Sequence, residues 1–122
     1  MPLTLTPETW LIADTHWGHD NIIRHCGRPP DHDERMFDGW RSAVGPDDTV
    51  LHLGDLMMGR DSWKLIERIR ALPGHKFLIR GNHDRQGRGF FDGLGFDVIG
   101  KWLIHGRVML THRPVFKESG AP

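Results

Sequence analysis

Three short, largely apolar segments of the chain end abruptly in residues whose side chains bind metals or transfer protons. Residues 10–13 run into Asp14-Thr15-His16, residues 50–53 into Gly54-Asp55, and residues 77–80 into Gly81-Asn82-His83-Asp84. Short apolar runs are typical of buried strands, and the loops at strand ends are where binding and catalytic groups concentrate. Because the pattern occurs three times, we expect the three strand ends to converge on one site.

Apolar residues at helical spacing predict two helices between these strands. Apolar positions 36, 37 and 40 predict a helix that ends near Gly45-Pro46, with Asp31 or Asp33 as its cap. A second apolar stripe starts at Trp63, repeats at positions 66, 69 and 72, and stops at Pro73-Gly74. We therefore expect both helices to cover the strands.

The last third of the chain reads as strands. These are predicted over residues 96–99, 102–104 and 107–111, with the last two joined by a two-residue turn at His105-Gly106. Strands and helices alternate first, and strands dominate last. This order favours an α/β fold in which two packed mixed β-sheets are flanked by helices.

The composition limits the classes of function. The chain has 122 residues, enough for a single domain over residues 1–122. Lysine plus arginine and aspartate plus glutamate both number 16, and this net charge of zero does not favour a protein that binds nucleic acid without catalysis. A single cysteine, no signal-like start and no apolar run of about 18 residues predict a cytoplasmic protein without a membrane partner.

The polar side chains at the strand ends form a set of metal ligands that combines carboxylate, imidazole and amide oxygen. The set is Asp14, His16, Asp55, Asn82, His83 and, after the last predicted strand, His112. These donors suit divalent manganese, iron or zinc, and a single cysteine excludes a thiolate zinc site. We expect Asp14 and His16 to point the same way, because residues two apart in an extended segment share a face.

The order of these motifs resembles that of the calcineurin-like metallophosphoesterases. The motifs are Asp14-x-His16, Gly54-Asp55, Gly81-Asn82-His83-Asp84 and Thr111-His112. The longer form of the first motif, residues 14–23 with Arg28-Pro29 following, is similar to that of small bacterial and phage phosphoesterases. Met58 stands where the protein phosphatases of this superfamily carry an aspartate. The resemblance implies a four-layer α/β/β/α fold and argues against a protein serine/threonine phosphatase.

The resemblance also implies a site for two divalent ions, either manganese, iron, zinc or nickel. Asp14 and His16 would bind the first ion, and Asn82 and His112 would bind the second. Asp55 would bridge the two, since a carboxylate can be shared by two cations.

The implied reaction is the hydrolysis of phosphomonoesters or phosphodiesters by metal-bound hydroxide. His83 would be the catalytic acid that protonates the leaving group. His19 either contacts the substrate phosphate or hydrogen-bonds within its loop, and Arg85 either contacts substrate or belongs to a solvated rim. The expected partner is a small phosphoester or nucleotide, with nucleic acid only as a substrate.

The sequence departs from the family pattern after His112. Family members usually have a later Gly-His-x-His, with one histidine for each metal, but this sequence ends at Pro122. We therefore expect a domain that is incomplete at its C-terminus, with a weakened second metal site and an exposed sheet edge through which copies could self-associate. The alternative function is a truncated, catalytically weak or inactive relative that acts as a binding or assembly module.

Several residues near the motifs are expected to be structural. Asp84 should fix its loop by accepting hydrogen bonds, and His52 should be a histidine at the edge of the core rather than a ligand. His32 is expected at the surface or at a helix cap. The tryptophans read as core, except Trp17, which is expected to line the pocket or stack on a base.

Overall fold

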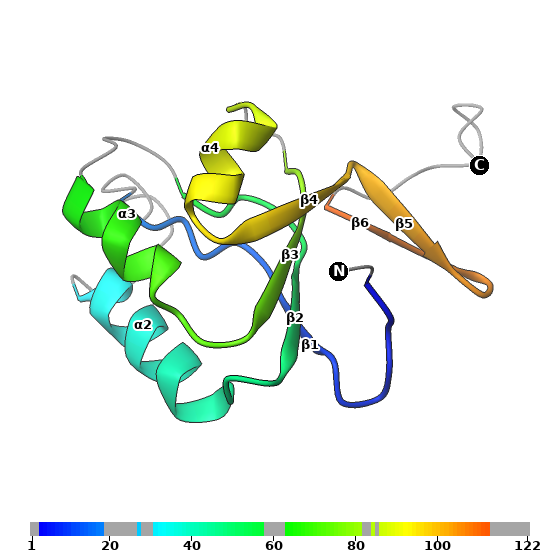
Figure 1. The fold of residues 1–122 in the computed structure, drawn as a ribbon, viewed down its shortest axis with the longest axis horizontal. Coiled ribbons are helices and arrows are strands. Elements are labelled where there is room, and N and C mark those ends of the chain that lie inside the picture. Colours follow the sequence, from blue (N-terminus) through cyan, green and yellow to red (C-terminus); the bar gives the residue numbers. More distant parts are fainter. Residues whose placement is uncertain are drawn as a thin grey trace.

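The computed structural model describes residues 3–18, 27, 31–57, 63–81, 84 and 86–112 (Figure 1). Its elements, in chain order, are β1 (Trp10–Ile12), α2 (His32–Ala43), β2 (Thr49–His52), α3 (Trp63–Arg70), β3 (His75–Ile79), α4 (Arg88–Gly93), β4 (Phe96–Gly100), β5 (Trp102–His105) and β6 (Val108–Thr111). None of the helices in this described part is long and apolar enough to cross a membrane.

Two sheets organise these elements. Strands β1, β2, β3 and β4 lie side by side in sequence order and all run parallel, while β5 and β6 form a separate antiparallel pair. Figure 1 shows the three helices on one side of the parallel sheet and the β5–β6 hairpin on the other. The expected α/β class with two sheets and flanking helices is confirmed. Among the described residues, each sheet is of one type rather than mixed.

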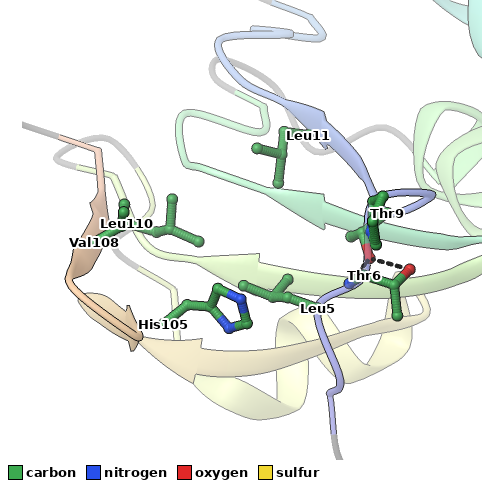
Figure 2. Close-up of a pocket in the computed structure, with 8 residues that line it drawn as sticks. Leu5, Thr6, Thr9, Leu11, His105, Val108 and Leu110 are labelled. Carbon is green, nitrogen blue, oxygen red and sulfur yellow. Dashed lines mark hydrogen bonds between the residues drawn. The ribbon is translucent and has the colours of Figure 1, made fainter.

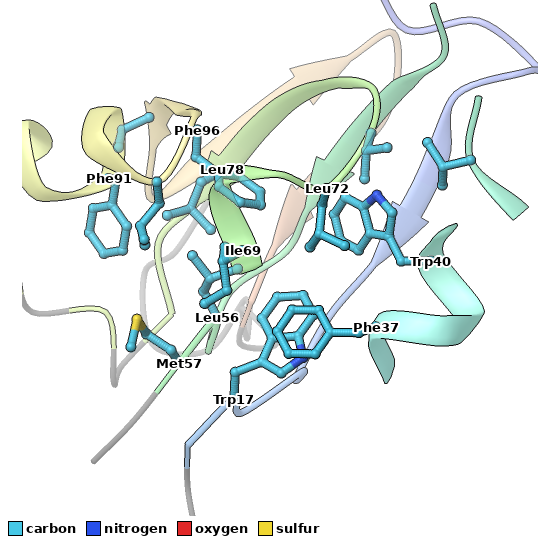
Figure 3. Close-up of a cluster of buried hydrophobic side chains, with 14 residues drawn as sticks. Trp17, Phe37, Trp40, Leu56, Met57, Ile69, Leu72, Leu78, Phe91 and Phe96 are labelled. Atoms are coloured by element: carbon cyan, nitrogen blue, oxygen red, sulfur yellow. The ribbon is translucent and has the colours of Figure 1, made fainter. Parts of the chain in front are cut away.

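Successive side chains of the central strands point alternately into two apolar clusters, one on each face of the parallel sheet. On the helix face, Val50 of β2 and Leu78 of β3 join the larger cluster, which also contains the buried apolar side chains of α2 and α4 (Figure 3). On the other face, Leu51 and Phe77 pack with residues of the N-terminal segment and of the hairpin. This alternation follows from the two-residue period of a strand, and it explains why the strands read as continuous apolar runs.

Trp17 belongs to the core, so the expectation that it lines the pocket is wrong. Its side chain has no exposed surface and stacks on Phe37, with ring centroids 4.9 Å apart and planes inclined by 13°. Figure 3 shows the two rings overlapping. The ring centroid of Trp40 lies 6.0 Å from that of Trp17. The indole anchors the loop after β1 onto α2, and this burial fixes the segment that carries Asp14 and His16.

Trp63 was expected in the core, at the start of a core-facing stripe, but it is 71% exposed. Trp63 is the first residue of α3, and the helix meets the core near its C-terminal end, where Ile69 and the following Leu72 are buried. Trp10, on the edge strand β1, and Trp102, in the hairpin, are also exposed rather than core.

The end of α3 is closed by a lysine from the neighbouring strand. Lys76 of β3 is buried, and its ammonium donates to the backbone oxygens of Ile69, Arg70 and Leu72 at 3.3, 3.0 and 2.8 Å. The last carbonyls of a helix lack partners in a following turn, so the ammonium supplies donors at this end of α3, where the Ile69 oxygen also accepts from the N–H of Leu72. Burial lowers the pKa of Lys76 to about 8.

Local details of caps and turns differ from expectation. Asp31 precedes α2, but among the described residues its carboxylate makes no capping bond and pairs with Arg35 instead. Asp33 accepts from the backbone N–H of Gly18 at 3.1 Å, so it ties the helix to the loop after β1 rather than capping it. The hairpin turn lies one residue later than expected, because His105 pairs with Val108.

Candidate metal centre

The loops after β1 and β2 run side by side beyond the ends of their strands. The backbone N–H groups of Asp14, His16 and Trp17 donate to the oxygens of Gly54, Asp55 and Leu56 at 3.0, 3.1 and 3.2 Å. Each of the two expected ligand segments therefore serves as the backbone partner of the other.

The backbone of these loops is not extended. Asp14, His16 and Asp55 have φ angles of 55°, 47° and 56°, in the left-handed region that non-glycine residues seldom adopt. The expectation that Asp14 and His16 share a face of an extended segment is therefore wrong. Both side chains still reach the same cluster, because the left-handed backbone at each residue changes the direction of its side chain. Conformations of this kind cost roughly 1 kcal/mol or more each and are maintained by their surroundings, most often at functional sites.

Carboxylate and imidazole groups converge above these loops. Asp14, Asp55 and His112 each offer one ligand atom, and these atoms all lie within 4.8 Å of one another. Nε2 of His112 lies 3.2 Å from Oδ2 of Asp55 and 3.9 Å from Oδ1 of Asp14. Nε2 of His16 lies 3.6 Å from a carboxylate oxygen of each aspartate. Asp55 and His16 are buried, whereas the Asp14 side chain is 48% exposed, so the cluster opens to solvent beside Asp14.

The donor set fits a divalent cation. Nδ1 of His112 lies 2.9 Å from the backbone oxygen of Leu53, which can only accept, so Nδ1 carries a proton and donates. In the neutral ring, Nε2 then presents a lone pair toward the carboxylate of Asp55. Two acceptors 3.2 Å apart need a positive charge between them or on the ring. Oxygen and imidazole donors of this kind bind divalent transition metals, and a second hydrogen bond that orients the ring is typical of metal-binding histidines.

Two glycines allow the loops to approach one another. A Cβ on Gly54, whose φ is +112°, would lie 2.7 Å from Cα of Gly81 and 2.7 Å from Nδ1 of His112. A Cβ on Gly81 would lie 2.6 Å from the backbone nitrogen of Asp55 and 3.1 Å from Cγ of His112. Real Cβ atoms do not come this close to backbone, so any larger residue would push the loops apart.

Asp84 holds the Asp55 loop from below, as expected from the sequence. Its buried carboxylate accepts from the backbone N–H groups of Asp55 and Gly81, both at 2.7 Å, and of Leu56 at 3.0 Å. Hydrogen bonds to an ionised acceptor are the stronger kind. Asp84 therefore fixes the backbone around the cluster and uses both carboxylate oxygens to do so.

The structure brings together four of the residues predicted to form the site: Asp14, His16, Asp55 and His112. The others, Asn82, His83, His19 and Arg85, lie outside the described residues, and their roles stay predictions.

Sequence reasoning missed His32, which was expected at the surface or at a cap. It is buried, and its Nε2 lies 2.5 Å from the backbone oxygen of Thr15. Its spacing of four and eight residues from Met36 and Trp40 placed it on the apolar face of α2, and this signal could have found it.

One hollow of the described surface lies apart from the cluster. An apolar groove of about 360 Å³ is formed by the N-terminal segment, β1 and the hairpin (Figure 2). Leu5, Leu11, His105 and Leu110 line it, and none of the clustered carboxylates does. Its lining is the wrong chemistry for a phosphate, so the groove does not compete with the cluster as a candidate catalytic site.

Comparison with known proteins identifies the family of this chain. Residues 8–117 match the family of calcineurin-like phosphoesterases. The chain belongs to this family. A calcineurin-like phosphoesterase domain implies metal-dependent hydrolysis of phosphoesters, which agrees with the acceptor-rich cluster of Asp14, Asp55 and His112. The family resemblance drawn from the motifs is thus confirmed.

The relatives are of the small archaeal and phage type. An uncharacterized protein, MJ1445, from Methanocaldococcus jannaschii is 34% identical in an alignment 125 residues long. This alignment covers 86% of this chain and 71% of that protein. Gene 66 protein of Mycobacterium phage L5 is 38% identical over 82 residues, and the match covers 63% of this chain and 40% of the phage protein.

A solved structure has the same fold. It is AQ665, a protein of unknown function from Aquifex aeolicus, with a TM-score of 0.65 and 29% identity. The match covers 83% of this chain and 56% of AQ665. This chain therefore spans just over half of the solved protein and two fifths of the phage protein.

Proposed function

We propose that this calcineurin-like phosphoesterase hydrolyses phosphomonoesters or phosphodiesters of small molecules or nucleotides, with divalent ions such as manganese in the cluster described above. The supporting observation is the orientation of His112. Its Nδ1 donates to Leu53 while its Nε2 faces the carboxylate of Asp55, an arrangement that suits a cation shared by the two side chains.

Each residue has a distinct task in this proposal. Asp14, His16 and Asp55 bind the first ion, and His112 with Asn82 binds the second, with Asp55 shared. When bound, the ions supply Lewis acidity and a nucleophile derived from water at neutral pH. His83 donates a proton to the leaving oxygen, and His19 and Arg85 orient the phosphate through charge-assisted hydrogen bonds.

The alternative, a binding or assembly module without catalysis, has less support. The family match extends over residues 8–117 and includes each of the expected metal-binding positions. The carboxylates and imidazoles that the structure describes are in contact rather than scattered. A module selected only for assembly would not need three strained residues at these positions.

The test is hydrolysis of an aryl phosphodiester and an aryl phosphomonoester by the purified chain in manganese. We expect His83→Ala to lower kcat by roughly 10²- to 10⁴-fold, and Asp55→Asn to remove both activity and bound metal. His75→Ala, at an exposed position on β3, is the matched control and should behave as the wild type. Equal rates for the wild type and Asp55→Asn would overturn the proposal.

A further inference from the structure

A buried histidine connects the backs of the two ligand loops. His52, the last residue of β2, has no exposed surface, and Phe96 packs against its ring edge to face at 6.1 Å. Nδ1 of His52 lies 3.1 Å from the backbone nitrogen of Gly54, and Nε2 lies 3.0 Å from the hydroxyl of Thr15. The Thr15 hydroxyl in turn lies 2.7 Å from the backbone oxygen of Leu56.

The donors and acceptors of this chain of bonds can run in one direction only. The Gly54 N–H can only donate, so Nδ1 of His52 accepts and the proton resides on Nε2. Nε2–H therefore donates to the Thr15 hydroxyl, which donates to the backbone oxygen of Leu56. Burial, with a smaller contribution from His112 and His16, lowers the pKa of His52 to about 3, which agrees with a neutral ring.

The chain of bonds has its end points beside the expected ligands. Thr15 lies between Asp14 and His16, while Gly54 and Leu56 flank Asp55. Among the described residues, these three ligands are the non-glycine residues with left-handed backbone, a conformation that persists only where the surroundings impose it.

Thr15 is also held from the side of α2. The ring of His32 donates to the Thr15 backbone oxygen, while His52 binds the Thr15 hydroxyl. The peptide between the two expected ligands is thus held at two separate atoms by two buried histidines.

We propose that His52, acting through Thr15, is a positioning residue that sets the separation of the Asp14–His16 loop from the Asp55 loop and so determines the affinity of the metal centre. This inference rests on the proposed function, because it takes the cluster to be a cation site. His52 touches neither metal nor substrate in this proposal. Partners of this kind typically change metal affinity or activity by about 10- to 100-fold when removed.

The experiment compares variants that keep or remove the hydrogen bond between His52 and the Thr15 hydroxyl. Thr15→Val keeps the shape and removes the hydroxyl, whereas Thr15→Ser keeps the hydroxyl. His52→Asn keeps an acceptor for Gly54 and loses the donor to Thr15. Thr49→Val, at the other end of β2, is the matched control. Manganese affinity is measured by calorimetric titration, and the free energy of unfolding is measured by urea in EDTA.

We expect Thr15→Val and His52→Asn each to weaken manganese binding about 10- to 100-fold. The double variant should be no weaker than Thr15→Val alone, because that change already removes the bond between His52 and Thr15. Thr15→Ser and Thr49→Val should bind as the wild type does. If Thr15→Val and His52→Asn unfold more easily but bind manganese as the wild type does, the role is structural only and the proposal is overturned.

The outcome for the proposed function is separate. A wild type that binds manganese but hydrolyses neither aryl phosphoester overturns the proposed function, while the comparison of affinities still decides the role of His52. A wild type that binds no manganese overturns both.

Discussion

Replacing Asp84 by asparagine tests how the Asp55 loop is held. The Asp84 carboxylate accepts two backbone N–H groups at Oδ2 and one at Oδ1. An amide keeps only one acceptor oxygen. If that oxygen takes the place of Oδ2, the amide NH₂ faces the N–H of Leu56, so one bond is lost and two become bonds to a neutral acceptor. Hydrogen bonds to charged groups contribute about 1.5–3 kcal/mol and neutral ones about 0.5–1.5 kcal/mol, so Asp84→Asn should lower the free energy of unfolding by roughly 3.5–6 kcal/mol.

The assay is urea unfolding in EDTA, followed by circular dichroism, so that metal binding does not contribute. The loss should appear as a lower midpoint with an unchanged slope, because the surface exposed on unfolding is the same. Asp97→Asn, at an exposed position of β4, is the control and should change the stability little. A loss below about 1 kcal/mol for Asp84→Asn would refute the reasoning, since even one lost charged bond exceeds it.

Three further predictions follow from packing and charge. Gly81→Ala should abolish manganese binding measured by calorimetry, because its Cβ would displace Asp55, whereas Gly87→Ala, which meets nothing within 4 Å, should bind normally. Lys76 has a folded-state pKa of about 8, below its ordinary 10.5, so the folded state binds fewer protons between these values and stability should rise with pH there. Urea titrations at pH 7.5 and 9.5 should show this rise, by at most about 1.4 kcal/mol per pH unit, and Lys76→Met should lack it. Phe37→Ala, at a fully buried site, should lower the free energy of unfolding by about 3–5 kcal/mol in the same assay, and a loss like that of a surface substitution would contradict the packing.

The elements of the fold were predictable because their signals are local. The apolar runs gave β1, β2 and β3 to within one or two residues, and the stripe at positions 36, 37 and 40 gave α2. Helical periodicity predicts which face of a helix is apolar but not which part of its length contacts the core. For this reason the prediction for Trp63 was wrong. The exposed Trp63 and the buried Ile69 lie on the same predicted stripe.

The candidate site was predictable as a group of residues but not as a geometry. Asp14, His16, Asp55 and His112 converge as expected, yet the left-handed backbone that aims the first three follows from contacts between loops. No periodicity encodes such contacts. The partners that hold the loops were equally hidden, except Asp84, which was predicted to fix its loop by accepting hydrogen bonds.

Contacts between distant segments escaped sequence reasoning most completely. Lys76 closes α3 from a neighbouring strand, and Trp17 leaves its loop to stack on Phe37 of α2. No signal in the sequence indicates that Lys76 contacts α3, and Trp17 was predicted to line the pocket. Both follow only from the tertiary arrangement.

The expected metal ligands come from both sheets of the structure. Asp14 and Asp55 follow strands of the parallel sheet, whereas His112 follows β6 of the hairpin on the opposite side from the helices (Figure 1). A cation shared by these residues would be a reversible cross-link between the two sheets. Because a ligand that binds only this arrangement of the two sheets stabilises it by mass action, a bound ion should slow amide exchange in the hairpin.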